Sequence, residues 1–260
     1  MSEKKANDKP VIKVAVMIPN EGHTQVEAYA NRLENFRHLG SLEEKGRLDD
    51  SPTRFEFYFV TVGRILTPKA REEGAKIAIE MEADYLYMID DDMICRHDLF
   101  ERLYRHDVDL VAPLAFTRNF PHSPVLYDIK EGVDPVTKEP YFINHHVLDY
   151  PRNVLTECDA VGFGAVLIKM DVLRAVEEPR FMSTTATGED ILFCHKVRKL
   201  GFRVFMDTDT CIGHLGHPII IDEEYRDKVL KQMNYEDNLS LRSKYTPEYK
   251  HGEEVLVLGD

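Results

Sequence analysis

The chain has 260 residues, of which 43% are hydrophobic and 30% are charged, a composition typical of a globular protein that buries a sizeable core. The formal net charge is −13. Because nucleic-acid binding needs a basic face, this charge argues against nucleic acid as the main partner. No apolar run approaches the roughly 20 residues of a membrane helix, so we expect no integral membrane segment.

The start of the chain and its cysteines indicate the compartment. Residues 1–10 are polar and Lys-rich without a following apolar segment, so we expect a short disordered tail and not a signal peptide. The four cysteines form no Cys-x-x-Cys pair and are too sparse for a disulfide scaffold. We therefore expect a cytoplasmic protein with reduced thiols. Residues 11–221 would form the main domain, followed by a C-terminal helix and tail over 222–260.

Strand and helix patterns alternate through the first 116 residues. Val11–Ile18 is almost unbroken apolar sequence, which is typical of a strand buried on both faces. The alternation predicts an α/β fold with a central, mostly parallel mixed sheet flanked by helices. Further strands are expected over residues 55–61, 84–89 and 110–116, and helices over 67–81 and 98–105.

The first helix is predicted to begin at Thr24, with Glu27 completing a capping box. Gly40 stands where a C-terminal cap is expected, ahead of a charged loop over 41–53. The predicted buried stripe consists of Val26, Tyr29, Leu33 and Phe36.

The second half gives weaker patterns. Residues 117–157 predict long loops with short strands, and Ala160–Met170 predicts one strand. A helix is expected near residue 190, with Thr187 as its N-cap. After a short strand over Phe202–Met206, Asp207-Thr208-Asp209 is typical of a turn.

Three consecutive aspartates, Asp90, Asp91 and Asp92, directly follow the most hydrophobic central strand. In an open parallel sheet, ligands bind just beyond the carboxyl ends of the strands. Adjacent carboxylates repel one another, and in a partly desolvated cleft they need protons or a cation. A solvated acidic turn is the usual meaning of such a triplet, but this position favours a divalent cation site.

The pair Glu189-Asp190 opens a predicted helix. Acidic side chains in a first turn are stabilised by the helix dipole, and this is sufficient reason for them to be there. The same dipole lowers the pKa of a carboxylate, so a catalytic base here requires burial or an acidic neighbour. From the residues alone, both interpretations stay open.

His214 lies between two glycines after the last predicted strand, where an exposed turn histidine is the common explanation. Beside the aspartate run, its imidazole would complete an otherwise oxygen-ligated site, which favours manganese over calcium and leaves magnesium open. Structural zinc on Cys211, His214 and His217 is the alternative. Their spacing matches no zinc finger or ribbon, and reduced packing cysteines explain the pattern better.

Several common motifs are missing. The sequence contains no GxxxxGK[ST] loop, no GxGxxG after the first strand and no GxSxG nucleophile elbow. These absences remove the common alternatives for an α/β nucleotide-binding chain.

Taken in order, the segments resemble a glycosyltransferase of the GT-A fold, similar to family 2-type nucleotide-sugar transferases. The resemblance covers roughly residues 11–217 and rests on the order and spacing of its segments. It implies a single GT-A-like, Rossmann-related domain with a nucleotide-sugar-binding half over 11–116 and an acceptor and catalytic half over 117–221. The matching segments are Met17–Pro19, Ala70–Glu72, Asp84–Asp92, Val161–Ile168, Gly188–Cys194 and Gly213–Gly216.

The resemblance implies roles at the donor site. Asp90 and Asp91 would contact the ribose and the sugar of a nucleotide-diphosphate sugar. Asp92 would ligate a manganese or magnesium ion together with His214, and Asp90 is a further candidate ligand. The remaining nucleotide-sugar contacts would come from Pro19, Asn20, Glu21 and Arg71, and from Gly162 and Gly164 beside the acceptor.

The resemblance also implies the reaction. Asp190 would be the general base that deprotonates an unknown acceptor hydroxyl, a glycan or a small molecule, in an inverting transfer, with Glu189 supporting it. The Gln-x-x-Arg-Trp motif of processive polysaccharide synthases is absent, since the chain has no tryptophan. Three rival functions remain: a sugar-phosphate nucleotidyltransferase, although its glycine-rich loop is missing, a metal-dependent phosphohydrolase, and a non-catalytic nucleotide-sugar-binding protein.

Overall fold

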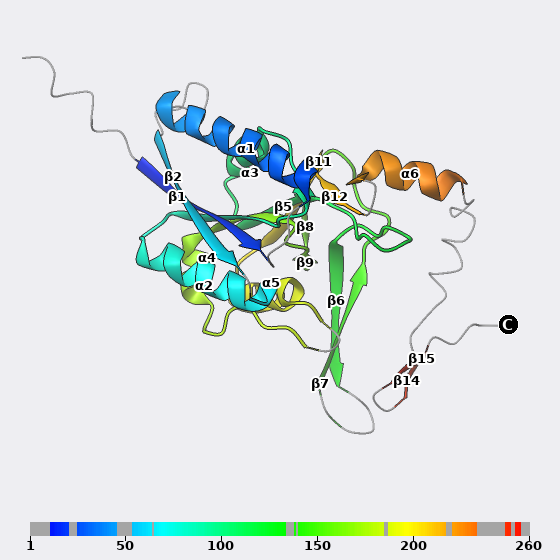
Figure 1. Cartoon of the computed structure of the whole chain (residues 1–260). Helices are drawn as coiled ribbons and strands as arrows, with labels where there is room; N and C mark the ends of the chain where they lie inside the picture. The colour runs from blue at the N-terminus through cyan, green and yellow to red at the C-terminus, as the bar shows by residue number, and fades with distance from the viewer. Residues whose placement is uncertain are drawn as a thin grey trace, which may run out of the picture.

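The structure is a computed structural model, shown in Figure 1. The tail predicted over residues 1–10, the cap Thr24 and the loop from residue 46 to 53 lie outside the part of the chain that it describes. The structure describes residues 11–20, 25–45, 54–63, 65–133, 138, 140–184, 187–216, 220–232, 248–250 and 253–255.

A seven-stranded sheet in the order β2-β1-β3-β10-β5-β11-β8 forms the centre of the fold. β1 pairs in parallel with β2 and β3, and β11 with β5, whereas β10 runs antiparallel between β3 and β5. The expected α/β class with a central mixed sheet is therefore confirmed. The strands are β1 (Val11–Asn20), β2 (Arg54–Gly63), β3 (Tyr85–Ile89), β5 (Leu110–Leu114), β8 (Leu155–Cys158), β10 (Ala165–Lys169) and β11 (Val204–Cys211).

Helices cover both faces of this sheet (Figure 1). On one face lie α1 (Val26–Lys45) and α3 (Leu99–Arg105). On the other lie α2 (Thr67–Glu80), α4 (Met170–Ala175) and α5 (Glu189–Lys199). In the described part of the chain, α6 (Glu223–Gln232) follows the small strand β13 (Ile220–Ile221). None of the helices in the described part of the chain combines the length and apolar character that crossing a membrane requires.

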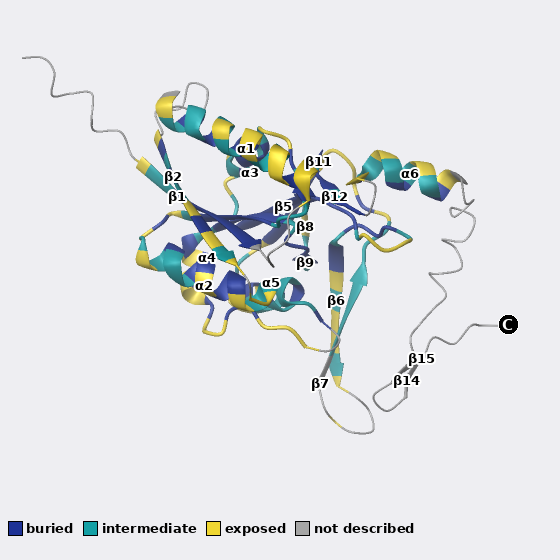
Figure 2. Cartoon of the chain, in the orientation of Figure 1, coloured by how far each residue is buried: buried dark blue, intermediate teal, exposed yellow. Residues whose placement is uncertain are grey.

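The two helical layers explain why the first strand is apolar throughout. Side chains alternate between the faces of a strand. In β1, Val14 and Val16 join the core beneath α1 and α3, whereas Ala15 and Met17 join the core that contains α2, α4 and α5. All four are completely buried, and the central strands are dark blue in Figure 2. A strand covered on both sides cannot alternate polar and apolar residues.

Small strands lie at the carboxyl edge of the sheet and beyond it. The segment 160–170 is divided into β9 and β10, where one strand was predicted. In the segment 117–157, two strands form a hairpin longer than expected, and it projects away from the sheet in Figure 1. These strands are β4 (Met93–Ile94), β12 (Gly213–Leu215) and β13 (Ile220–Ile221), β6 (Leu126–Val133), β7 (Pro140–His146) and β9 (Ala160–Val161), and β14 (Glu248–Lys250) with β15 (Glu253–Val255).

The prediction for the first helix was wrong about its buried face. Val26, Tyr29 and Leu33 of the predicted stripe are 73%, 53% and 51% exposed. The helix also continues through Gly40 to its end at Lys45. Glycine costs a helix interior only about 1 kcal/mol, and packing of the following turn compensates for it.

A small residue, a polar residue and two leucines form the face of α1 that is buried. Ala28, Asn35, Leu39 and Leu42 are each at most 7% exposed. Asn35 is buried because its amide donates to the backbone oxygen of Cys95, at 3.3 Å. A pattern that counts only large apolar side chains cannot find such a face.

Two predictions about local structure in the second half were also wrong. Asp207, Thr208 and Asp209 belong to β11 and not to a turn, although the register against β5 shifts between Asp207 and Cys211. The N-cap of α5 is Gly188, with no side-chain capping bond, so Thr187 does not cap it.

The buried face of α1 can be tested with a matched pair of substitutions. Leu39→Ala removes a side chain that is 3% exposed, so we expect a loss of about 2–4 kcal/mol in the free energy of unfolding. Leu33→Ala, at 51% exposure, should change it by at most about 0.5 kcal/mol. Urea denaturation of both variants measures this. Equal losses would contradict the packing described here.

Candidate functional site

The aspartate run forms the turn between β3 and β4 at the carboxyl edge of the sheet. The amide of Asp90 donates to the carbonyl of Gly164 at 2.8 Å, and the amide of Met93 to the carbonyl of Asp90 at 3.4 Å. The three side chains have different surroundings, because each position of the turn faces another element. Asp90 meets α2, the carbonyl of Asp91 meets α1, and Asp92 meets β12.

Arg71 is the centre of the first cluster. Its side chain is buried, and one terminal nitrogen donates to both carboxylate oxygens of Asp90 at 2.8 and 2.9 Å. The other terminal nitrogen donates to Glu189. The carbonyl of Phe163 accepts a further bond at 3.1 Å, and the guanidinium lies 5.5 Å from the centre of the Phe163 ring. One guanidinium therefore joins the end of β3 to the start of α5.

Buried charge shifts the acidity of the carboxyls around Arg71. Burial raises the pKa of Asp90 to about 6, although the charge of Arg71 opposes this shift. Burial also raises the pKa of Asp190, and the charge of Glu189 adds to the shift while Arg71 reduces it. A carboxylate at the start of a helix would otherwise be a weak base. The condition that the sequence left open for Asp190, burial with an acidic neighbour, is therefore met.

The backbone fixes Asp190. Its Oδ1 accepts a bond from the amide of Ile191 at 2.8 Å. A Cβ atom on Gly188 would lie 2.7 Å from that Oδ1, so the carboxylate packs directly over the glycine. Tyr127 of β6 is buried nearby, and burial together with the charge of Asp190 raises the pKa of its phenol. Asp190 therefore lies in the first turn of α5, near Tyr127 of β6, a strand of the projecting hairpin.

The second cluster is built by strand pairing. β12 pairs with β4, which places His214 opposite Met93, and the amide of Leu215 donates to the carbonyl of Asp92 at 2.9 Å. The imidazole Nε2 of His214 then lies 3.4 Å from Oδ2 of Asp92. Asp92 and His214, which are 122 positions apart in the sequence, lie side by side because Asp92 directly precedes β4 and β4 pairs with β12.

The tautomer of His214 suits a metal ligand. Its Nδ1 lies 2.9 Å from the carbonyl oxygen of Phe116, so Nδ1 carries the hydrogen and the lone pair of Nε2 accepts the bond from Nε of Arg118. The residues fit a divalent cation, since a carboxylate oxygen and an imidazole nitrogen converge and already hold the cationic guanidinium of Arg118. Among the described residues, no group of three or more His, Cys, Asp or Glu side chains converges, so phosphate and water would complete the shell.

The other residues predicted to contact the nucleotide sugar are described by their backbone positions. Pro19 and Asn20 end β1 at the same edge of the sheet, and Glu21 lies outside the described residues. The amide of Gly162 donates to the carbonyl of Val125 at 2.8 Å, and the carbonyl of Gly164 accepts from Asp90. Their predicted contacts with a nucleotide sugar stay predictions.

The sequence reasoning missed two basic residues at this edge. Arg32 of α1 donates to the carbonyl of Asp91 at 3.0 Å. Arg118 follows β5 and bonds both Asp92 and His214. A signal existed for Arg118, because a cation two residues after an apolar strand ending in Phe116 lies at the edge where ligands bind. Nothing in the pattern of α1 indicates the inward direction of Arg32.

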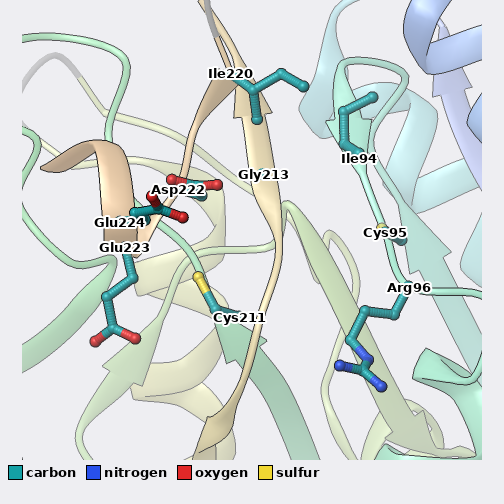
Figure 3. A pocket seen from close by; sticks show the side chains of 9 residues that line it. All are labelled: Ile94, Cys95, Arg96, Cys211, Gly213, Ile220, Asp222, Glu223 and Glu224. Atoms are coloured by element: carbon teal, nitrogen blue, oxygen red, sulfur yellow. The ribbon is translucent and has the colours of Figure 1, made fainter.

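A cavity of about 400 Å³ lies beside the second cluster, lined by strands β4, β12 and β13 (Figure 3). Gly213 lines it, and the alternation of β12 turns the side chain of His214 to the opposite face. Arg96 stands at one side and Asp222, Glu223 and Glu224 at the other. The cavity therefore lies behind the candidate site and contains none of the predicted site residues.

No family model matches the sequence, and no curated protein matches it. Its fold does match solved structures. The crystal structure of A197 from STIV aligns with a TM-score of 0.52 at 15% identity, over 79% of this chain and 86% of that chain. At this identity the likeness shows a shared fold and no more.

Two glycosyltransferase structures align less well. One is the catalytic domain of Drosophila beta1,4galactosyltransferase 7 in complex with xylobiose, with a TM-score of 0.41, 16% identity and coverage of 79% of this chain and 71% of that chain. The other is GalNAc-T7 with UDP, GalNAc and Mn2+, with a TM-score of 0.45, 12% identity and coverage of 80% and 45%. Because both scores are low, neither likeness carries an argument about this protein, and family 2 membership stays a prediction.

The raised pKa of Asp90 predicts a pH dependence of stability. The folded carboxyl, with a pKa of about 6 against its usual 3.8, binds its proton more tightly than the unfolded chain does. Its contribution to the free energy of unfolding is therefore complete below about pH 4 and is lost as the pH rises to about 6, a change of at most about 3 kcal/mol. Asp90→Asn should flatten this slope, measured by urea denaturation between pH 4 and pH 7.

Asp98→Asn is the matched control for the opposite sign. A hydrogen bond from Arg96 lowers the pKa of Asp98, and burial opposes this shift only in part. Asp98 therefore contributes stability above the pKa of the unfolded chain and loses that contribution as the pH falls. If Asp90→Asn kept the wild-type slope between pH 4 and pH 6, the burial of Asp90 described here would be contradicted.

Proposed function

We propose that the protein is a metal-dependent glycosyltransferase that moves a sugar from a nucleotide diphosphate to an acceptor hydroxyl. The observation that carries this proposal is the bridge made by Arg71 between Asp90 and Glu189. This bridge connects the turn that carries Asp92 with the start of the helix that carries Asp190, and these two carboxylates have different surroundings. Asp92, two residues after Asp90, faces a histidine ligand, and Asp190, the neighbour of Glu189, has the raised pKa of a base.

The metal side of the site would use Asp92 and His214. A manganese or magnesium ion held there would stabilise the negative charge that develops on the leaving diphosphate. Asp90 is less suited to be a ligand than the sequence implied, because both of its oxygens accept bonds from Arg71. Its role in the proposal is to position the turn that carries Asp92.

The acceptor side would use Asp190. Its carboxylate takes the proton of the acceptor hydroxyl while that oxygen forms a bond to the anomeric carbon and the bond from this carbon to the diphosphate breaks. The attack comes from the face opposite the leaving group, so the proposal favours inversion. Glu189 supports the base because its charge raises the pKa of Asp190, and its own carboxylate accepts a bond from Arg71.

A transfer assay tests the proposal. A thermal-shift screen of nucleotide sugars with and without manganese would first identify the donor, because a ligand that binds only the folded protein raises the apparent stability. With that donor, Asp92→Ala should lose metal-dependent transfer. Asp190→Asn should still bind the donor but lose about 10²- to 10⁴-fold in kcat.

Two outcomes would contradict the proposal. Full transfer activity in Asp92→Ala would remove the metal site, and near-normal turnover in Asp190→Asn would remove the base. Release of pyrophosphate from a nucleoside triphosphate and a sugar phosphate, without sugar transfer, would instead identify a nucleotidyltransferase.

The packing of Asp190 over Gly188 gives a second test. In Gly188→Ala the new Cβ would lie 2.7 Å from Oδ1 of Asp190, so the carboxylate must move, and a misplacement of this size costs about 10²-fold in kcat. The control is Gly40→Ala, where a Cβ meets nothing within 4 Å and the helix should gain about 0.5–1 kcal/mol. Unchanged turnover in Gly188→Ala would show that the position of Asp190 does not matter to the reaction.

A further inference from the structure

Arg118 occupies the place between the two proposed metal ligands. Its Nε donates to Nε2 of His214 at 2.7 Å, and one of its terminal nitrogens bonds Oδ2 of Asp92. These are the two atoms that would face a divalent cation. The lone pair of Nε2 cannot serve a guanidinium and a metal at once, because Nδ1 already uses its hydrogen on the carbonyl of Phe116.

We propose that Arg118 and the divalent cation compete for Asp92 and His214, and that the displaced guanidinium binds the diphosphate of the donor. This inference rests on the proposed function. It assigns Arg118 as a diphosphate-binding residue and makes metal binding alone weaker than metal binding together with the donor.

The geometry allows the displacement. Arg118 lies in the segment after β5, and its side chain is 53% exposed, whereas that of Asp92 is 17% exposed. Asp92 and His214 are therefore the more enclosed partners, and the guanidinium enters from the solvent side. An ion pair with a half-exposed partner contributes little free energy, so breaking it costs little.

Electrostatic forces would direct the displaced side chain of Arg118 towards the diphosphate. A divalent cation at Asp92 would repel a guanidinium a few ångströms away. A diphosphate on that cation would attract the guanidinium, since its fork of donors matches two phosphate oxygens. Arg118 would exchange the carboxylate for the phosphate and would place a further positive charge beside the leaving group.

Calorimetric titration of the full chain with two probes tests the proposal. With Mn²⁺ alone, Arg118→Gln should bind about fivefold more tightly than wild type, the scale of a half-exposed ion pair. With the manganese–pyrophosphate complex, the same variant should bind about fivefold more weakly. A purely structural role for Arg118 would weaken both, so the opposite signs identify the competition.

Control variants distinguish a failure of the Arg118 competition from a failure of the proposed metal site. Arg96→Gln removes an arginine that bonds Asp98 at 2.9 Å, and both affinities should stay at the wild-type value. Arg118→Lys, which keeps the charge without the fork, should give intermediate values and provides the test if the glutamine variant does not fold. Unchanged or weaker Mn²⁺ binding in both Arg118 variants, with binding still lost in Asp92→Asn, would overturn the competition alone. Mn²⁺ binding that survives Asp92→Asn would overturn the metal site of the proposed function.

Discussion

The bridge made by the buried guanidinium of Arg71 is the interaction on which the site depends. It bonds Asp90 and Glu189, which are 99 positions apart in the sequence, and its single positive charge offsets part of the desolvation cost of these two partly buried carboxylates. The next residue of α2, Glu72, accepts a bond from the guanidinium of Arg180 at 2.8 Å and further bonds from the backbone amides of Arg180 and Phe181. One turn of α2 therefore fixes both ends of the segment from residue 180 to 189.

Different interactions position the Asp190 side and the Asp92 side of the site. On the Asp190 side, buried charge and close packing over a glycine position the carboxylate and make it a stronger base. On the Asp92 side, ladder hydrogen bonds between β4 and β12 fix the imidazole, and the guanidinium that bonds it reaches in from a more exposed segment. The first half is built from enclosed groups, whereas the second contains one half-exposed partner, Arg118. This division suits the proposed reaction, in which Asp190 would keep its position while a charged donor binds and leaves.

Much of the fold could be predicted from the sequence because burial on both faces of a sheet leaves a strong pattern. The strands at Val11, Phe55 and Leu110 were located from apolar runs, and the aspartate run was placed at the carboxyl edge. The inward face of α1 was not found, because Asn35 is buried through a bond to the backbone of Cys95 that no local pattern encodes. The strand that contains Asp207 was mistaken for a turn, because aspartates are common in turns and the sequence does not show that Asp207 is buried.

The sequence by itself determined the α/β class and the chemical types that the site would need: a run of carboxylates after a strand, an acidic pair at a helix start and a histidine between glycines. It left open whether Asp190 was a base or a helix-stabilising charge, because a pKa depends on burial and on neighbours that are distant in the chain. Only the tertiary structure decided that Arg71 joins Asp90 to Glu189 and that Arg118 shares Asp92 with His214. Long side chains can reach several partners from one backbone position, so their pairing is set by which strands and helices meet and not by spacing along the chain.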